Sequence, residues 1–307
     1  MRDVVVTGAN GWIGSRVGSL LEQRGLRVIG VSRQPERARA KRPQWRWIGT
    51  GAELEEAVER AGVVVNLAGR NPVERPWTPE FVTEMRASRI RTTERIVAAL
   101  RWSPMPERIL VSGSGALGYG NTGQDSVTED DSIRRELMLG DMAVDWEAAA
   151  SPVEEAGVRL VVARIGVVLG AEAGAFPMLR APFDNGAGLV FGTGRQWVPW
   201  VHIADAARLI VDAVLDPVYR GPLNVVAPNP ARHAEIVAAI GEVLGVPRTN
   251  VVPAEQVARM LGPAAEMVLA SQRLVPRRAA AAGFDFWHPD LVGAIKQILT
   301  EGAGDAR

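Results

Sequence analysis

The sequence predicts an α/β protein built on a parallel sheet that helices cover on both faces. In the first half of the chain, short apolar runs alternate with segments of helical periodicity. These runs show no polar alternation, which is typical of strands buried on both faces of a parallel sheet. With 307 residues, 47% of them hydrophobic, the chain is long enough for one large domain or two closely joined ones. Ligands of such sheets bind at the carboxyl ends of the strands.

The first predicted strand leads directly into a glycine-rich turn. The apolar residues 4–6 are followed by TGANGWIG, residues 7–14, and then by a segment with helical spacing. In such a unit Gly8 makes the tight turn, Gly11 lets the backbone approach a diphosphate, and Gly14 lets the helix pack closely on the strand. Backbone N–H groups and the positive end of the helix then face the phosphates. The motif therefore predicts a dinucleotide site in a Rossmann-type, doubly wound parallel sheet, and a plain structural turn is the alternative.

The later elements follow in order along the chain. After a helix that Gly25 ends, we expect strands at residues 27–32, 45–48, 63–67, 108–112 and 159–169, and helices at residues 53–61, 78–100 and about 139–156. Beyond Gly170 the pattern loosens, and helices are expected at residues 204–215, 231–244 and 289–299. We therefore expect a Rossmann-type dinucleotide-binding domain at residues 1–170 and a smaller C-terminal substrate or lid domain at residues 171–307. The boundary is soft, and residues 221–226 are a candidate strand of the main sheet.

The composition argues against several classes of protein and site. The chain has no cysteine for a disulfide, a thiolate metal site or a nucleophile, and its three histidines lie far apart without metal-ligand spacing. The formal net charge is zero and the basic residues are scattered, which argues against nucleic acid as a partner. No apolar run reaches about 18 residues, and the N-terminus lacks the pattern of a signal peptide. We expect a cytoplasmic protein without metal or membrane that binds a small molecule, and its oligomeric state is left open.

Several motifs together resemble those of the extended short-chain dehydrogenases/reductases. They are TGANGWIG, the NLAG of residues 66–69, the SGS of residues 112–114 and the RIG of residues 164–166. A narrower resemblance, to the epimerase-like family of uncharacterised oxidoreductases often labelled nucleoside-diphosphate-sugar epimerases, rests on residues 76–78, 88–93, 146–147, 192–205, 221–230 and 269–286. The match covers nearly the whole chain. It implies a nicotinamide cofactor and a small-molecule substrate.

The charge at the end of the second predicted strand distinguishes between the two nicotinamide cofactors. NAD-binding units usually place an acidic residue about 20 residues beyond the glycines, whereas an arginine accommodates a 2′-phosphate. Here the strand ends at Ser32 and Arg33 without a carboxylate, and Arg37, Arg39 and Lys41 follow closely. We therefore expect NADP, because arginines pair well with a doubly charged phosphate. A solvated basic helix start is the alternative.

The expected cofactor contacts come from the glycine motif, from the ends of the second and fourth strands, and from the helix that follows. They are Gly8, Asn10, Gly11, Trp12, Ile13, Ser32, Arg33, Leu67, Ala68, Gly69 and Arg89. The resemblance implies that residues 66–69 approach the nicotinamide ribose and that Arg89 reaches the cofactor phosphates or the substrate. Pairing of Arg89 with Glu84 or Glu94 on its own helix is the alternative.

The resemblance also implies a catalytic set that this chain does not supply in full. Extended dehydrogenases generally carry a serine and a Tyr-x-x-x-Lys pair, which provides an acid–base group beside the hydride path. Aligning Glu147 with the glutamate that often follows the lysine places Leu139 and Ala143 at the tyrosine and lysine positions. Asp141 and Asp145 on the same predicted helix either act in catalysis or lie solvated at the surface.

Ser114 and Tyr119 are the expected catalytic residues. Ser114 matches the family serine and would hold and polarise a substrate oxygen by hydrogen bonding, whereas satisfying turn backbone groups is its alternative role. Tyr119 is the tyrosine near that edge and the first candidate for proton donor, against a packed loop aromatic. The resemblance implies that Gln196, Trp197 and Trp200 face the substrate, and core packing is the alternative for the tryptophans.

Three functions fit the sequence. The first is an NADP-dependent oxidoreductase or epimerase-like enzyme that transfers hydride between the nicotinamide and a small carbonyl or alcohol. The second is an NADP-binding protein with little turnover, acting as a sensor or binding a partner, which the missing Tyr-x-x-x-Lys pair supports. The third is a non-redox isomerase, lyase or cyclase on the same fold. We favour the first.

Overall fold

The computed structural model describes residues 2–304, and the chain divides into two compact units. Unit 1 comprises Met1–Ser114, Met142–Arg164 and Ala207–Leu223, and unit 2 comprises Gly115–Asp141, Ile165–Ala206 and Asn224–Arg307. The units are interleaved in sequence and so differ from the continuous segments 1–170 and 171–307 expected above. The difference arises because residues 207–223, from beyond residue 170, belong to unit 1, whereas residues 115–141 belong to unit 2.

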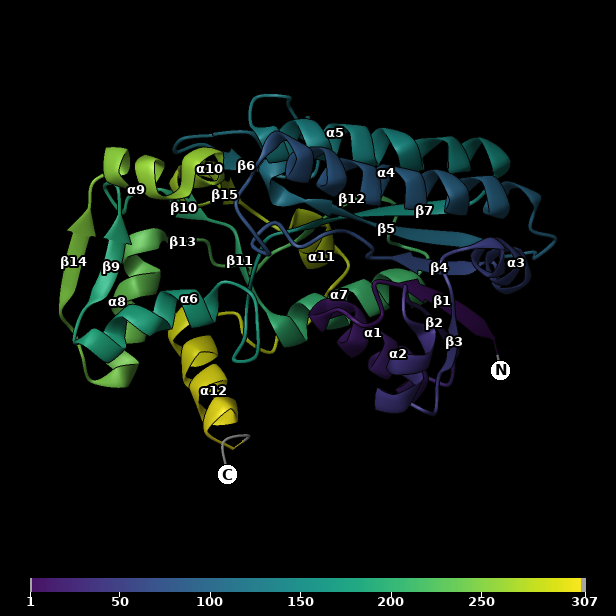
Figure 1. Ribbon diagram of the computed structural model, residues 1–307, viewed down its shortest axis with the longest axis horizontal. Helices are drawn as coiled ribbons and strands as arrows, with labels where there is room; N and C mark the ends of the chain where they lie inside the picture. Colours follow the sequence, from purple (N-terminus) through teal and green to yellow (C-terminus); the bar gives the residue numbers. More distant parts are fainter. Residues whose placement is uncertain (1, 305–307) are drawn as a thin grey trace. The chain divides into compact units, whose positions relative to one another are not determined.

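The sheet lies mainly in unit 1 and has seven strands in the order β12-β7-β5-β4-β1-β2-β3 (Figure 1). The strands are β1 (Asp3–Thr7), β2 (Arg27–Val31), β3 (Arg46–Ile48), β4 (Val63–Asn66), β5 (Ile109–Gly115), β7 (Arg159–Ile165) and β12 (Gly221–Val225). The pairs β1–β2, β2–β3, β1–β4 and β4–β5 are parallel. Because the order runs outward from β1 in both directions, the predicted doubly wound, Rossmann-type α/β fold is confirmed. The candidate strand at residues 221–226 does join this sheet, as β12.

Helices cover both faces of the sheet. Helices α4 and α5 lie on one face, and α1 and α7 on the other (Figure 1). Since both faces are covered, Val4, Val5 and Val6 are all fully buried, which explains why this strand reads as a continuous apolar run. The helices are α1 (Trp12–Gln23), α2 (Pro35–Lys41), α3 (Ala52–Ala61), α4 (Pro79–Trp102), α5 (Met138–Ala150) and α7 (Ile203–Leu215), with the 3-10 helix η2 (Ser151–Ala156).

Unit 2 consists of short strand pairs and helices. Its strands are β6 (Ser126–Val127), β8 (Val167–Leu169), β9 (Gly188–Phe191), β10 (Trp197–Val198), β11 (Trp200–His202), β13 (Ala231–Arg232), β14 (Thr249–Val252) and β15 (Arg273–Leu274). Pairs β9–β14, β8–β11 and β6–β15 are parallel, and β10–β13 is antiparallel. The helices are α6 (Phe176–Arg180), α8 (His233–Leu244), α9 (Ala254–Leu261), α10 (Glu266–Leu269), α11 (Arg277–Ala281) and α12 (Leu291–Gly304), with the 3-10 helices η1 (Ala116–Tyr119), η3 (Ala181–Asn185) and η4 (Gly262–Ala265).

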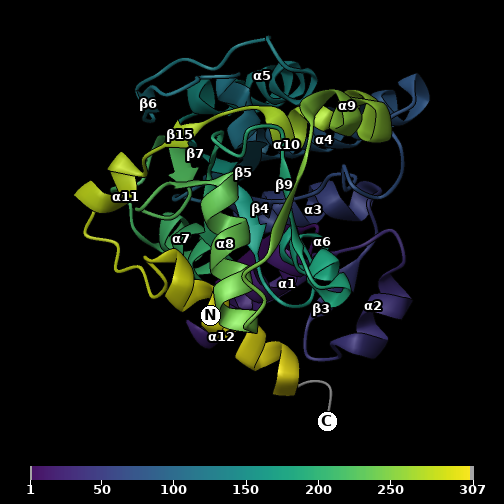
Figure 2. The ribbon, with the colours of Figure 1, turned by 90° about the vertical axis from the view of Figure 1, so that its left-hand side faces the viewer.

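The core of unit 2 gathers around α8 (Figure 2), which packs against β9 and α12. Val237 and Ile240 of α8 and Ile298 of α12 are fully buried in one apolar cluster. These apolar positions account for the helical periodicity seen in the sequence at residues 231–244 and 289–299. Within residues 2–304, no helix is long and apolar enough to cross a membrane.

Two predicted elements are divided in the structure. The strand expected at residues 159–169 is broken at Gly166, whose N–H donates to the carbonyl of Val225 and where a Cβ would lie 2.0 Å from the carbonyl oxygen of Pro199. Strand β8 then pairs with β11, outside the main sheet. The helix expected at residues 139–156 ends at Ala150, and η2, which starts with Ser151-Pro152, continues the chain because proline lacks the N–H that an α-helix interior needs.

Candidate functional site

A cavity of about 1090 Å³ opens in unit 1 at the carboxyl ends of β1, β2 and β4. Eight of the eleven expected cofactor-binding residues line it: Gly8, Asn10, Gly11, Ser32, Arg33, Leu67, Ala68 and Gly69. Trp12 and Ile13 form the first turn of α1, directly after this lining. The cavity occupies the edge where doubly wound sheets bind their ligands.

The glycines of the first turn are required by backbone geometry. Gly8 has φ +68°, and a Cβ there would lie 2.5 Å from the carbonyl oxygen of Leu67. At Gly14 a Cβ would lie 2.2 Å from the carbonyl oxygen of Gly8, so only glycine permits α1 to start this close to the turn. Gly11 is the N-cap of α1, and no side chain caps its amides. These N–H groups are therefore available to an anion at the positive end of the helix.

A cluster of basic side chains lies at the end of β2. Arg33, Arg37 and Lys41 line the cavity, are exposed, and form no ion pair within the part of the chain that the structure describes. Arg39, by contrast, does not line the cavity and pairs with Glu36 at 3.0 Å. The arrangement favours the 2′-phosphate interpretation over a merely solvated helix start, because three cations share one cavity wall.

Arg89 of α4 carries a poorly solvated positive charge. Its Nη1 and Nη2 donate to the carbonyls of Met85 and Arg70, both at 2.9 Å, and its Cζ lies 5.2 Å from the ring centre of Trp146. Burial lowers the pKa of Arg89 to about 10. Among residues 2–304 it pairs with neither glutamate considered from the sequence, and Glu84 instead pairs with Arg70 and Arg75. The contact predicted between Arg89 and a cofactor or substrate stays a prediction.

A chain of buried hydrogen bonds fixes the ends of β1 and β4. Thr7 Oγ1 donates to Asn66 Oδ1 at 2.6 Å, and Asn66 Nδ2 donates to Thr93 Oγ1 at 2.8 Å. Trp146 Nε1 donates to the same Thr93 oxygen at 3.0 Å. Because these groups are buried and satisfied, they hold the strand ends in one geometry.

Ser114 lies on β5, at the end of the first segment of unit 1, and contacts a buried ion pair. Its Oγ lies 2.7 Å from Glu147 Oε1, and Arg164 donates to both oxygens of Glu147 at 2.9 Å. Glu147 and Arg164 belong to motifs seen in the sequence, but the motifs assigned them no function. The available signal was the single charge of Arg164 within the otherwise apolar residues 160–165. Asp141 and Asp145 are ion-paired with Arg135 and Arg86, which supports the surface alternative for both.

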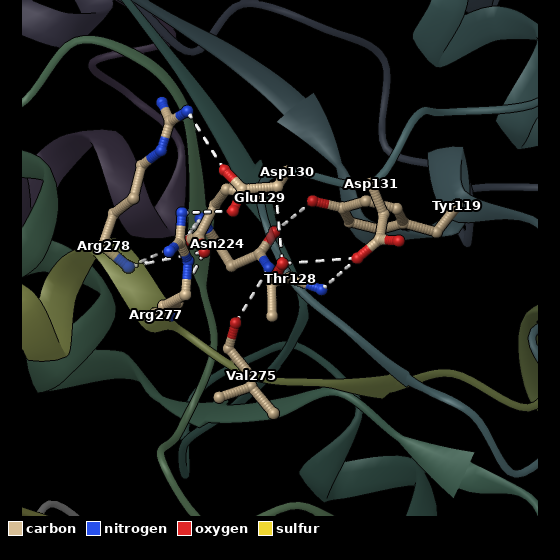
Figure 3. A network of polar contacts seen from close by, with 9 residues as sticks. All are labelled: Tyr119, Thr128, Glu129, Asp130, Asp131, Asn224, Val275, Arg277 and Arg278. Carbon is tan, nitrogen blue, oxygen red and sulfur yellow. Dashed lines mark hydrogen bonds and ion pairs between the residues drawn. The ribbon is translucent and has the colours of Figure 1, made fainter.

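Tyr119 belongs to a polar network of unit 2 (Figure 3). Its side chain is 1% exposed, and its hydroxyl donates to Asn224 Oδ1 at 2.8 Å. Asn224 is held in turn, because its Nδ2 donates to the carbonyl of Val275 and its N–H to Glu129 Oε1, both at 3.0 Å. Glu129 also accepts the N–H of Arg277 at 3.1 Å. This geometry favours a packed aromatic with a satisfied hydroxyl, and the catalytic role of Tyr119 stays a prediction.

The three residues expected to face the substrate differ in their surroundings within unit 2. Gln196 is 8% exposed and donates to the carbonyls of Phe191 and Val268. Trp200 is 1% exposed and donates to the carbonyl of Asn229, so it packs in the core.

Trp197 is partly exposed, and two guanidinium groups lie near its ring. The Cζ atoms of Arg232 and Arg273 lie 4.6 and 4.8 Å from its ring centre. Its indole N–H donates to Gln124 Oε1, which also accepts from Arg232. Of the three expected pocket residues, Trp197 is therefore the one with a reachable surface.

Comparison with protein families and known sequences gives consistent matches along the chain. Residues 4–225 match the NAD dependent epimerase/dehydratase family, and residues 252–298 match a domain of unknown function, DUF1731. The chain is 34% identical to the chloroplastic Epimerase family protein SDR39U1 homolog of Arabidopsis thaliana, over 96% of this chain and 86% of that protein. It is 32% identical to the Epimerase family protein YfhF of Bacillus subtilis, over 97% of this chain and 98% of that protein.

Solved structures resemble the chain over nearly its whole length. The human epimerase family protein SDR39U1 (isoform2), crystallised with NADPH, has a TM-score of 0.85 at 32% identity and covers 97% of this chain and 99% of its own. The UDP-glucuronic acid 4-epimerase of Bacillus cereus, solved with UDP-glucuronic acid and NAD, has a TM-score of 0.78 at 16% identity and covers 99% of this chain and 100% of its own. The second similarity shows likeness of fold alone.

Proposed function

The chain belongs to the NAD dependent epimerase/dehydratase family, and from this premise we propose that it binds NADP in the cavity of unit 1 and acts as an oxidoreductase or epimerase-like enzyme on a small carbonyl or alcohol. One observation carries the proposal. A glycine turn that leaves helix amides free and three cations without carboxylate partners line the same cavity. A ligand with a diphosphate and an additional phosphate matches both features.

Each part of the cavity has a proposed role toward the cofactor. The amides at the start of α1 bind the diphosphate, and Gly8 and Gly11 keep the backbone close to it. Arg33, with Arg37 and Lys41, binds the 2′-phosphate that distinguishes NADP from NAD. The crystallisation of the human relative with NADPH supports this choice. When bound, the nicotinamide supplies hydride chemistry, which no side chain of the protein can supply.

A second candidate function is NADP binding with little turnover. It is favoured by the residues at the usual catalytic positions, because Leu139 and Ala143 have no group that exchanges a proton. A measurement of absorbance at 340 nm with a panel of carbonyl and alcohol substrates distinguishes the candidates. Turnover with a net change in absorbance supports the oxidoreductase, and NADPH binding without turnover supports the second candidate. Substrate conversion at constant absorbance supports an epimerisation, in which the hydride returns to the substrate, or a non-redox reaction.

The cofactor assignment is tested by Arg33→Ala with Arg39→Ala as its matched control. Both residues are exposed arginines of the same segment, but only Arg33 lines the cavity. In a fluorescence titration Arg33→Ala should weaken NADPH binding about 10-fold, the effect of one exposed charge-assisted hydrogen bond, and leave NADH binding unchanged. Arg39→Ala should change neither. Equal losses for NADPH and NADH in Arg33→Ala would contradict the 2′-phosphate role.

A further inference from the structure

The Ser114 hydroxyl already donates its proton to a hydrogen bond within the protein. Ser114 is 4% exposed, and its Oγ lies 2.7 Å from Glu147 Oε1. An ionised carboxylate can only accept hydrogen bonds, so the serine must be the donor. Its oxygen then has only lone pairs to offer any ligand at the carboxyl end of β5.

Arg164 holds Glu147 in place. The arginine side chain is 5% exposed and donates Nε and Nη2 to the two carboxylate oxygens at 2.9 Å each. A guanidinium does not lose its proton in a protein, so these two donors are always present. The bidentate geometry also fixes the carboxylate plane. Ser114 therefore faces a rigid acceptor.

From this geometry we infer that the Ser114–Glu147–Arg164 arrangement selects the alcohol member of an alcohol/carbonyl couple and removes its hydroxyl proton. The inference rests on the proposed function and deepens it, because it names the class of substrate that the site takes. It also reverses the direction of the hydrogen bond expected from the sequence. A carbonyl oxygen would meet the lone pairs of Ser114, whereas an alcohol donates its O–H to them.

The proton transfer balances with the groups present and one co-reactant. The alcohol O–H bond breaks, its proton passes to Ser114 Oγ, and the proton of Ser114 passes to Glu147 Oε1. The carbinol C–H bond breaks with its electron pair, which leaves as hydride to an oxidised nicotinamide dinucleotide, and the carbon–oxygen bond becomes a carbonyl. The Glu147 side chain is 13% exposed, so the proton can then leave to water. Ser114 is the catalytic residue here, and Glu147 acts through it.

Ser112 provides a matched control on the same strand. It lies two residues before Ser114 and so faces the same side of β5, and it is 1% exposed. Among residues 2–304, however, its hydroxyl contacts only the carbonyl of Gly113, at 3.5 Å, and no carboxylate. Ser112→Ala and Ser114→Ala therefore each remove one hydroxyl group from similarly buried positions. Only Ser114→Ala removes a contact with the ion pair.

The test is ligand-observed NMR with matched alcohol and ketone pairs, from 2-butanol and butanone to hexopyranosides and their keto forms, added to the protein with NADP. The wild type and Ser112→Ala should bind the alcohol about 10-fold more tightly than the ketone, the effect of one hydrogen bond. Ser114→Ala should lose this difference. Glu147→Gln should reverse it, because the amide presents an N–H donor to Ser114 and frees the serine proton for a carbonyl oxygen.

If the ion pair has only a structural role, Ser114→Ala and Glu147→Gln will weaken the binding of the alcohol and of the ketone equally, and the alcohol will still bind more tightly. That result would overturn the inference. So would preferential binding of the ketone to the wild type, or binding of neither ligand by protein that binds NADPH. If the protein binds no NADPH, the proposed function itself fails.

If Glu147→Gln does not fold, the Ser114→Ala comparison still decides the matter, since that variant keeps the ion pair intact. For any alcohol that is oxidised, a proton inventory in mixed H₂O and D₂O should be curved, because two protons move, and a linear inventory would contradict the relay. The Ser114→Ala variant should then lose about 10²- to 10⁴-fold in kcat, the contribution of a positioned proton acceptor.

Discussion

His233 makes the stability of this protein depend on pH. Its side chain is 4% exposed at the start of α8 and stacks on Phe191, with ring centres 5.2 Å apart. Both ring nitrogens are buried without a hydrogen-bond partner among the residues that the structure describes. Burial therefore lowers the pKa of His233 from its ordinary value of 6.5 to about 4. The folded protein keeps this imidazole neutral at pH 7.

The direction and size of the effect follow from proton binding. Between pH 6.5 and pH 4, His233 binds a proton in the unfolded chain but not in the folded chain. The free energy of unfolding therefore falls as the pH drops through this window. Above pH 6.5 the stabilising contribution is fully present. At about 1.4 kcal/mol per pKa unit, the depression corresponds to about 3 kcal/mol, most of which is lost by about pH 4.5.

Urea unfolding of the wild type and of His233→Phe at about pH 7 and about pH 4.5 tests the prediction. The phenylalanine keeps an aromatic ring against Phe191 and does not titrate, so groups common to both proteins cancel in the comparison. We expect the free energy of unfolding of His233→Phe to gain about 2–3 kcal/mol relative to that of the wild type on going from the higher pH to the lower. A difference in unfolding free energy that is the same at both pH values would refute the reasoning.

Two further substitutions test the two units separately. Tyr119→Phe should lower the free energy of unfolding, measured in urea, by about 1–2 kcal/mol, because it leaves the buried Asn224 Oδ1 without its donor. It should leave NADPH affinity unchanged. An unchanged midpoint of urea unfolding would contradict the importance of this hydrogen bond. Gly14→Ala should weaken NADPH binding at least about 10-fold in a fluorescence titration, since its Cβ would clash with Gly8 at 2.2 Å and displace α1. Gly51→Ala, where a Cβ meets nothing within 4 Å, is the control and should bind normally.

Much of the cavity lining in unit 1 was predictable because its determinants are local. The turn needs glycine at Gly8 because its φ is positive, and at Gly14 because a Cβ there would meet the carbonyl oxygen of Gly8, six residues earlier. Arg33 lies two residues after the end of β2, so its place near the strand end could be inferred from the strand prediction alone. The strands of the main sheet could also be predicted, because a strand that is buried on both faces is a short, continuous apolar run.

What the sequence by itself determined is the doubly wound sheet, the glycine turn and the basic edge of the cavity, since each depends on residues close together in the chain. Only the tertiary structure decided which side chains meet. Ser114 and Glu147 are 33 residues apart, Glu147 and Arg164 are 17 apart, and Tyr119 and Asn224 are 105 apart, on elements whose contacts no periodicity encodes. The direction of the Ser114 hydrogen bond depends on where folding places a carboxylate, because a hydroxyl can either donate or accept until its neighbours are known.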